Sequence, residues 1–136
     1  MSPKQQNPKF SENISDFCKM ISEIQEDYQW NCSEISRLDK LTQDYLHMLE
    51  LNGLDYGERA KVATKLARCR QERRESKDTV AVLDPLIQFL ESGEGKSMMN
   101  AMKKILGKTR KVEENMKLRT YRYKVFSENN KQQLTK

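Results

Sequence analysis

The chain has 136 residues, of which 36% are hydrophobic and 33% are charged, and its formal net charge is +5. This length favours one domain, and five glycines with three prolines supply too few turns for a many-stranded sandwich or barrel. No apolar run reaches the roughly 18 residues of a membrane-spanning helix, and the polar N-terminal residues lack the apolar core of a secretory signal. We therefore expect an all-α, cytoplasmic protein.

A long helix is predicted for residues 11–52. Residues 1–9, with Pro3 and Pro8 among polar side chains, are expected to form a flexible arm, and Ser11 is a candidate N-cap. Apolar residues then repeat in alternating steps of four and three, as in a coiled-coil seam. Only Asn31 and Thr42 interrupt the apolar character of this seam, which consists of Phe10, Ile14, Phe17, Ile21, Ile24, Tyr28, Asn31, Ile35, Leu38, Thr42, Tyr45 and Leu49.

A second helix is predicted for residues 57–91. Gly53 suits the left-handed position that ends the first helix. Asp55 followed by Glu58 resembles a capping box at the start of the next helix. Pro85 either kinks this helix or restarts it after Asp84. The short link between the two helices makes them antiparallel neighbours, so residues 11–91 form a coiled-coil hairpin.

A third helix is predicted for residues 97–118. It follows a break at residues 92–95, and Ser97 is its candidate N-cap. Gly107 lies inside it and predicts a bend. Residues 120–126 alternate as in a strand and predict a short extended segment, and residues 127–136 form a polar tail. Residues 10–126 are thus a single helical domain, an antiparallel bundle of a long hairpin plus a third helix.

The two helices of the hairpin have a predicted register. Aligning their repeats places Leu38 opposite Cys69. The same alignment pairs Phe17 with Leu90, Ile24 with Leu83, Tyr28 with Val80, and Tyr45 with Val62.

One polar layer interrupts this predicted seam, because the alignment brings Asn31, Arg73 and Ser76 to one level. We expect the layer to fix the register, with Arg73 hydrogen-bonded inside it or to Glu34 or Asp27. The alternative is a polar notch for a partner. We expect the third helix to fold back along the side of the hairpin that carries Leu41 and Met48.

Charge is divided unevenly along the chain. Residues 1–58 contain 11 acidic and 5 basic side chains, and residues 59–136 contain 9 acidic and 20 basic ones. Such asymmetry is typical of a basic surface for nucleic acid or for an acidic protein. It also arises when an acidic half packs against a basic half of the same chain.

The densest basic run, residues 68–78, is the first candidate binding surface. Arg70, Arg74 and Lys77 share one helical face with Arg73, at spacings that suit phosphates or carboxylates. The competing interpretation is that Glu34, Asp27 and Glu26 of the first helix neutralise this face.

A second basic region follows at residues 103–124. Aromatic side chains among basic ones can stack on single-stranded bases, but they can equally be the buried face of the last element. The candidate binding residues of this region are Lys104, Arg110, Lys111, Arg119, Tyr121, Arg122 and Tyr123.

The sequence offers no catalytic or metal-ligating set. The three cysteines are unpaired in spacing and the single histidine has no matching ligands, so we expect reduced thiols and no metal. Residues 93–97 end in Gly-Lys-Ser but follow a predicted helix rather than a strand, which excludes a phosphate loop. We therefore expect neither an enzyme nor a cofactor.

Several segments together resemble small helical proteins of phages and prophages of Gram-positive bacteria. These segments are Tyr28-Gln-Trp30, Leu38-Asp39-Lys40, residues 44–50, residues 70–78 and Arg119-Thr-Tyr121. The resemblance implies an accessory protein, in the host cytoplasm, that binds a host or phage protein and inhibits or regulates it. Nucleic acid is the alternative partner, no membrane is involved, and a homodimer would complete the narrow seam.

Overall fold

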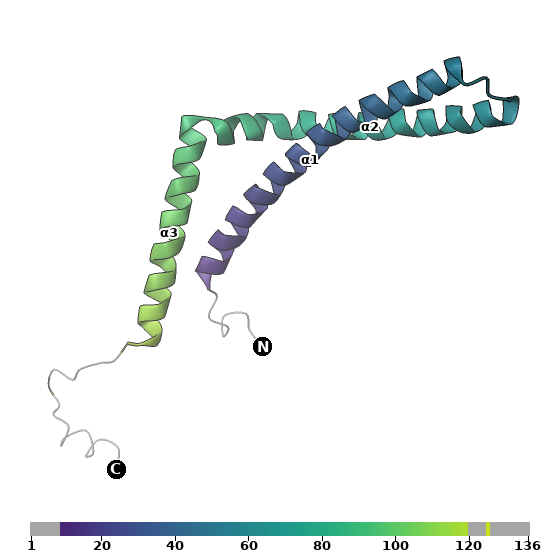
Figure 1. Cartoon of the computed structure of the whole chain (residues 1–136). Helices are drawn as coiled ribbons and strands as arrows, with labels where there is room; N and C mark the ends of the chain where they lie inside the picture. Colours follow the sequence, from purple (N-terminus) through teal and green to yellow (C-terminus); the bar gives the residue numbers. More distant parts are fainter. Residues whose placement is uncertain (1–8, 120–124, 126–136) are drawn as a thin grey trace, which may run out of the picture.

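The computed structural model describes residues 9–119 and residue 125, and these residues form an all-α fold. The chain contains α1 (Phe10–Leu51), α2 (Tyr56–Glu91) and α3 (Gly93–Lys117) (Figure 1). This confirms the predicted class and the three predicted helices to within a few residues. The predicted arm, apart from Lys9, the tail, and the extended segment at 120–126, apart from residue 125, lie outside the described residues.

The link between α1 and α2 has the predicted chemistry. Gly53 adopts a left-handed φ of 56° just after α1 ends, where a side chain would be strained. The Asp55 carboxylate accepts a 2.8 Å hydrogen bond from the Glu58 backbone N–H and caps α2. This bond stabilises the ionised form and lowers the pKa of Asp55. The turn and cap make α1 and α2 antiparallel.

The corner between α2 and α3 is tighter than predicted. Ser92 alone separates the helices, and its hydroxyl accepts a 3.1 Å hydrogen bond from the Gly95 backbone N–H. The prediction that Ser97 caps the helix is wrong, because α3 already begins at Gly93. At Gly95 an added Cβ would lie 1.9 Å from the Phe89 carbonyl oxygen, so a glycine lets the two backbones approach this closely.

The main apolar cluster lies at this corner, where all three helices meet. Ile21 of α1 and Ile87 and Leu90 of α2 are buried there. The half-buried side chains packed against them are Phe17, Ile24, Tyr28, Leu83, Leu86, Met98 and Met99. The cluster therefore contains both partners of two predicted pairs, Phe17 with Leu90 and Ile24 with Leu83. The cluster thus joins the hairpin to the first turns of α3.

α3 does not follow the side of the hairpin that was predicted. Figure 1 shows α3 turning sharply away from α2 at the corner and running beside the N-terminal part of α1. Its Glu113 is hydrogen-bonded to Ser11 near the start of α1, whereas Leu41 and Met48 lie in the C-terminal part of α1. The prediction failed because the one-residue corner at Ser92 fixes the direction of α3, and the pattern of apolar residues along α3 does not reveal that direction.

The beginning of α1 is stabilised by a carboxylate from α3. Ser11 is not the N-cap, because α1 begins at Phe10 and Lys9 is the capping residue, with no side-chain bond. Instead the Ser11 backbone N–H and hydroxyl donate to the two Glu113 carboxylate oxygens at 3.0 and 2.6 Å. These hydrogen bonds lower the pKa of Glu113. An anion at a helix N-terminus satisfies free N–H groups and the positive end of the helix dipole.

Two predicted weak points leave the helices continuous. α2 passes through Pro85 without a restart, and α3 passes through Gly107. Within the part of the chain that the structure describes, no helix combines the length and the apolarity needed to cross a membrane.

Candidate binding surfaces

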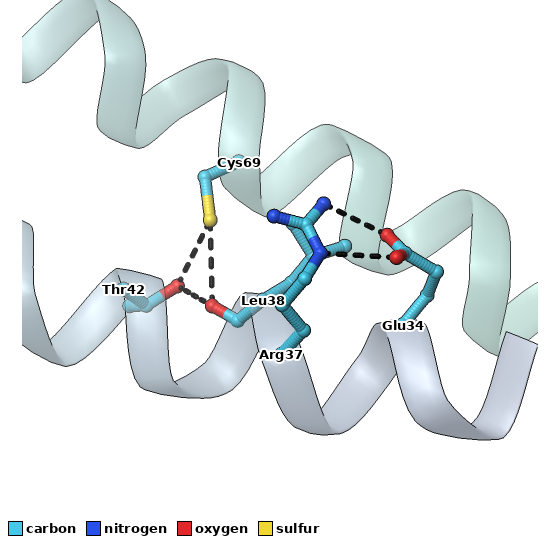
Figure 2. A network of polar contacts seen from close by, with 5 residues as sticks. All are labelled: Glu34, Arg37, Leu38, Thr42 and Cys69. Carbon is cyan, nitrogen blue, oxygen red and sulfur yellow. Dashed lines mark hydrogen bonds and ion pairs between the residues drawn. The ribbon is translucent and has the colours of Figure 1, made fainter.

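The seam of the hairpin is fixed by a small polar network near its middle. Thr42 Oγ1 donates a 2.8 Å hydrogen bond to the carbonyl of Leu38, one turn earlier in α1. From α2, Cys69 Sγ lies 3.4 Å from both that carbonyl oxygen and Thr42 Oγ1 (Figure 2). All three residues are buried, and Leu38 is only 1% exposed. The predicted opposition of Leu38 and Cys69 is therefore confirmed, and with it the register at this level.

Glu34 does not neutralise the basic run of α2. Its two carboxylate oxygens accept hydrogen bonds of 3.0 and 2.8 Å from Nε and one terminal nitrogen of Arg37, on the same helix (Figure 2). This bidentate pair lowers the pKa of Glu34 and raises that of Arg37. Arg37, three residues further along α1, therefore binds the carboxylate that was predicted to pair with the basic run of α2.

Arg73 is held by a residue that the sequence analysis did not propose as its partner. Its Nε donates to Oδ1 of Asp39 across the seam. The predicted bonds from Arg73 to the polar layer, or to Glu34 or Asp27, are therefore wrong. The Asn31 side-chain amide instead donates to the carbonyl of Asp27 at 2.8 Å.

The error over Arg73 has a simple geometric cause. Arg73 and Ser76 do occupy the seam, half-buried and buried respectively. However, a long guanidinium reaches one turn along the neighbouring helix, whereas the register compares residues at one level. Asp39 lies one helical turn further along α1 than the residue opposite Arg73. An acidic residue at that position was the signal in the sequence that could have identified this partner.

Three cations of α2 consequently remain exposed beside the seam. Arg70, Arg74 and Lys77 all face solvent, and we call them the basic row. Among the described residues, the ion pairs within 4.0 Å are Lys9 with Glu12, Arg37 with Glu34, and Arg73 with Asp39. None of these involves the basic row, so ion pairs among the described residues do not neutralise its charge.

The predicted cations of α3 lie apart from the basic row. Lys104, Arg110 and Lys111 are exposed on α3, and Arg119 is exposed just beyond it. Because α3 turns away from α2 at the corner, the two basic regions lie on different parts of the molecule (Figure 1). Tyr121, Arg122 and Tyr123 lie outside the described residues, and the predicted interleaving of aromatic and basic side chains lies there with them.

The described residues contain no cluster of three or more histidine, cysteine, aspartate or glutamate side chains placed to hold a metal ion. Cys18, Cys32 and Cys69 are free thiols. On the surface of the described residues, some open hollows lie between two helices and others lie along α2 alone. One of them, between α1 and α3, mixes both signs of charge, with Asp16, Glu113 and Arg110 among its lining residues.

Comparison with known proteins adds no relative, since no family model matches this chain and no curated protein or solved structure is significantly similar to it.

Proposed function

We propose that this protein is a non-enzymatic accessory protein of the phage type, which binds a host or phage protein through the rigid surface of its hairpin. The observation that carries the proposal is the basic row. Arg70, Arg74 and Lys77 are exposed on a helix whose position is fixed by the buried network at Leu38 and Cys69. Arginine offers bidentate hydrogen bonds to carboxylates, so the partner presents an acidic surface.

Charges bordering the basic row favour a protein partner over nucleic acid. Glu75 and Asp78 lie on α2 within one turn of Arg74 and are exposed. They would repel a continuous phosphate backbone, whereas a protein surface can place a few carboxylates opposite the cations and none opposite the acids. The partner is therefore recognised by the spacing of its charges.

A matched pair of charge-reversal variants tests this proposal. The first variant replaces the basic row (Arg70→Glu, Arg74→Glu, Lys77→Glu). The control replaces three exposed cations on the same helix outside the basic run (Arg59→Glu, Lys61→Glu, Lys65→Glu) and changes the net charge equally. We expect the wild type and the control to capture the same host or phage protein, and the first variant to lose it. Equal loss in both variants would show that only total charge matters.

Nucleic acid remains the second candidate, favoured by the seven cations of α3 against its three acids. Its binding falls steeply with salt, with a slope set by the number of phosphates contacted. Retardation of DNA or RNA at low salt that disappears with Lys104→Glu and Lys111→Glu would favour this second function. Absence of retardation at low salt would eliminate it.

A further inference from the structure

An open groove runs between α1 and α3 beside the corner, and we call it the corner groove. Its volume is about 660 Å³, within the range of about 300–1,000 Å³ that is typical of ligand sites. Its lining extends over about 15 Å of α1, from Ser15 to Gln25, and over about 10 Å of α3, from Lys96 to Lys103. No residue of the basic row lines it, so the corner groove is a separate candidate surface.

Short side chains on α1 leave this groove open. Ser15, Cys18 and Ser22 line it and follow one another at steps of three and four, which places them on one face of the helix. Side chains of this length do not fill the space between two neighbouring helices. The groove therefore has room for the side chains of a ligand.

The floor of the corner groove is apolar. Ile21 and Leu90, which are 5% and 4% exposed, line it together with the half-buried Met99. All three side chains belong to the cluster in which the three helices meet, so the floor is part of the packed core. An apolar floor favours a ligand that brings apolar side chains of its own.

The walls of the corner groove carry mainly positive charge. Its charged lining residues are Lys19 of α1, Lys96 and Lys103 of α3, and Glu91 at the end of α2. All four are exposed, and none takes part in an ion pair within 4.0 Å among the described residues. α3 begins beside Glu91, and the positive end of its dipole adds to the lysines. The groove therefore attracts negative charge.

The spacing of these lysines matches a helical ligand. Lys96 and Lys103 are seven residues apart, which is about two helical turns or about 10 Å. Carboxylates seven residues apart on another helix repeat at the same distance, and the side chains between them on that face are free to contact the floor. A groove between two helices accepts an amphipathic helix through such anchors. A phosphate backbone carries no apolar side chains to cover the floor.

We propose that the corner groove binds an acidic amphipathic helix of a partner protein. The carboxylates of that helix pair with Lys19, Lys96 and Lys103, and its apolar side chains cover Ile21 and Met99. The proposal goes beyond the proposed function, because the groove shares no residue with the basic row and its test leaves that row intact.

Cys18 provides the first test, because its thiol lines the groove. In the full chain carrying Cys32→Ser, Cys18 is the half-buried thiol that remains, since Cys69 is only 3% exposed. The probe is a helical peptide of about 14 residues, built from alanine, leucine and glutamate, with its glutamates seven residues apart. At about ten times its Kd it should slow alkylation of Cys18 by iodoacetamide about tenfold, because the bound peptide covers the thiol.

A matched peptide with glutamine in place of every glutamate is the control for this experiment. It should leave the alkylation rate of Cys18 unchanged. Equal protection by both peptides would overturn the proposal, because the groove would not recognise negative charge. Absence of protection by the acidic peptide at millimolar concentration would overturn it as well.

Lysine variants provide the second test. Lys19→Gln with Lys103→Gln should weaken binding of the labelled acidic peptide about tenfold, as measured by fluorescence anisotropy. Lys104→Gln with Lys108→Gln is the control, because both lysines are exposed on α3 outside the lining of the groove. The control removes the same charge and should bind as the wild type does. Equal weakening in the two variants would mean that only net charge matters and would overturn the proposal.

An oligothymidylate used as a second probe distinguishes a protein ligand from nucleic acid. We expect it to leave the alkylation rate of Cys18 unchanged. If it slows alkylation, and Lys19→Gln with Lys103→Gln removes the effect, the groove is a phosphate site and the proposal is wrong.

Discussion

The hairpin of α1 and α2 and the pair formed by α1 and α3 are both antiparallel pairs of helices, yet different interactions hold them. In the hairpin, α1 and α2 share a continuous seam in which Leu38, Cys69 and Thr42 are buried and hydrogen-bonded. In the second pair, α1 and α3 meet at the apolar corner and again at the hydrogen bonds between Ser11 and Glu113. The apolar side chains between these two contacts are only partly covered.

The difference shows that a sharp corner between helices can leave surface exposed for binding without weakening the seam that stabilises the hairpin. A hairpin satisfies its apolar seam within the chain, so its outer surface is free to carry a charge pattern such as the basic row. Where the far part of α3 runs beside the start of α1, no third helix covers the pair, and apolar side chains such as Phe10 and Met116 stay exposed. The following predictions test this contrast.

The largest effect is expected when the seam of the hairpin loses its most buried side chain. Leu38→Ala should lower the free energy of unfolding by about 2–5 kcal/mol, because it leaves a cavity between α1 and α2. Urea denaturation followed by circular dichroism measures this loss. Leu46→Ala is the control, because Leu46 lies on the same helix but is 43% exposed. Equal losses in the two variants would mean that the seam is not the main source of stability.

A smaller effect is expected at the corner. Gly95→Ala should cost about 1–3 kcal/mol, because the added Cβ collides with the backbone of Phe89 and Leu90. Small-angle scattering should also show that α3 moves relative to the hairpin. Gly93→Ala is the matched control, because no atom lies within 4 Å of its added Cβ. It should be neutral or slightly stabilising, since alanine favours a helix more than glycine does.

The smallest effect is expected where the end of α3 meets the start of α1, and it depends on pH. The pKa of Glu113 is lowered in the folded protein by its hydrogen bonds to Ser11. Its contribution to stability is therefore complete above the pKa of an unfolded glutamate and is lost as pH falls through the lower folded value. Hydrogen exchange of the Ser11 amide, corrected for its intrinsic rate, should accelerate over this range.

The variant Glu113→Gln checks the source of that pH dependence. It should show faster exchange at Ser11 at neutral pH and no further acid acceleration. Glu114→Gln, the neighbouring exposed residue, is the control and should behave as the wild type. An acid response that survives Glu113→Gln would assign the titration to another group.

Local patterns in the sequence determined the three helices, the link between α1 and α2, and the register of the hairpin. Steps of four and three identify the apolar side of α1 because side chains at these spacings share one face. Gly53 and Asp55 identify the turn because each satisfies a local backbone requirement. The opposition of Leu38 and Cys69 followed from joining two such patterns with a short link.

Only the tertiary structure decided where α3 lies and which charges are paired. The apolar residues of α3 show which side of the helix is apolar but not which helix packs against it. The close approach of the backbones at Gly95 sets the direction in which α3 leaves the corner. Long side chains reach past the level of their own residue, so Arg73 contacts Asp39 and Glu34 turns to Arg37. Helical periodicity is a property of neighbours along the chain, whereas the corner, the bonds between Ser11 and Glu113 and the exposure of the basic row depend on backbones and charges meeting in space.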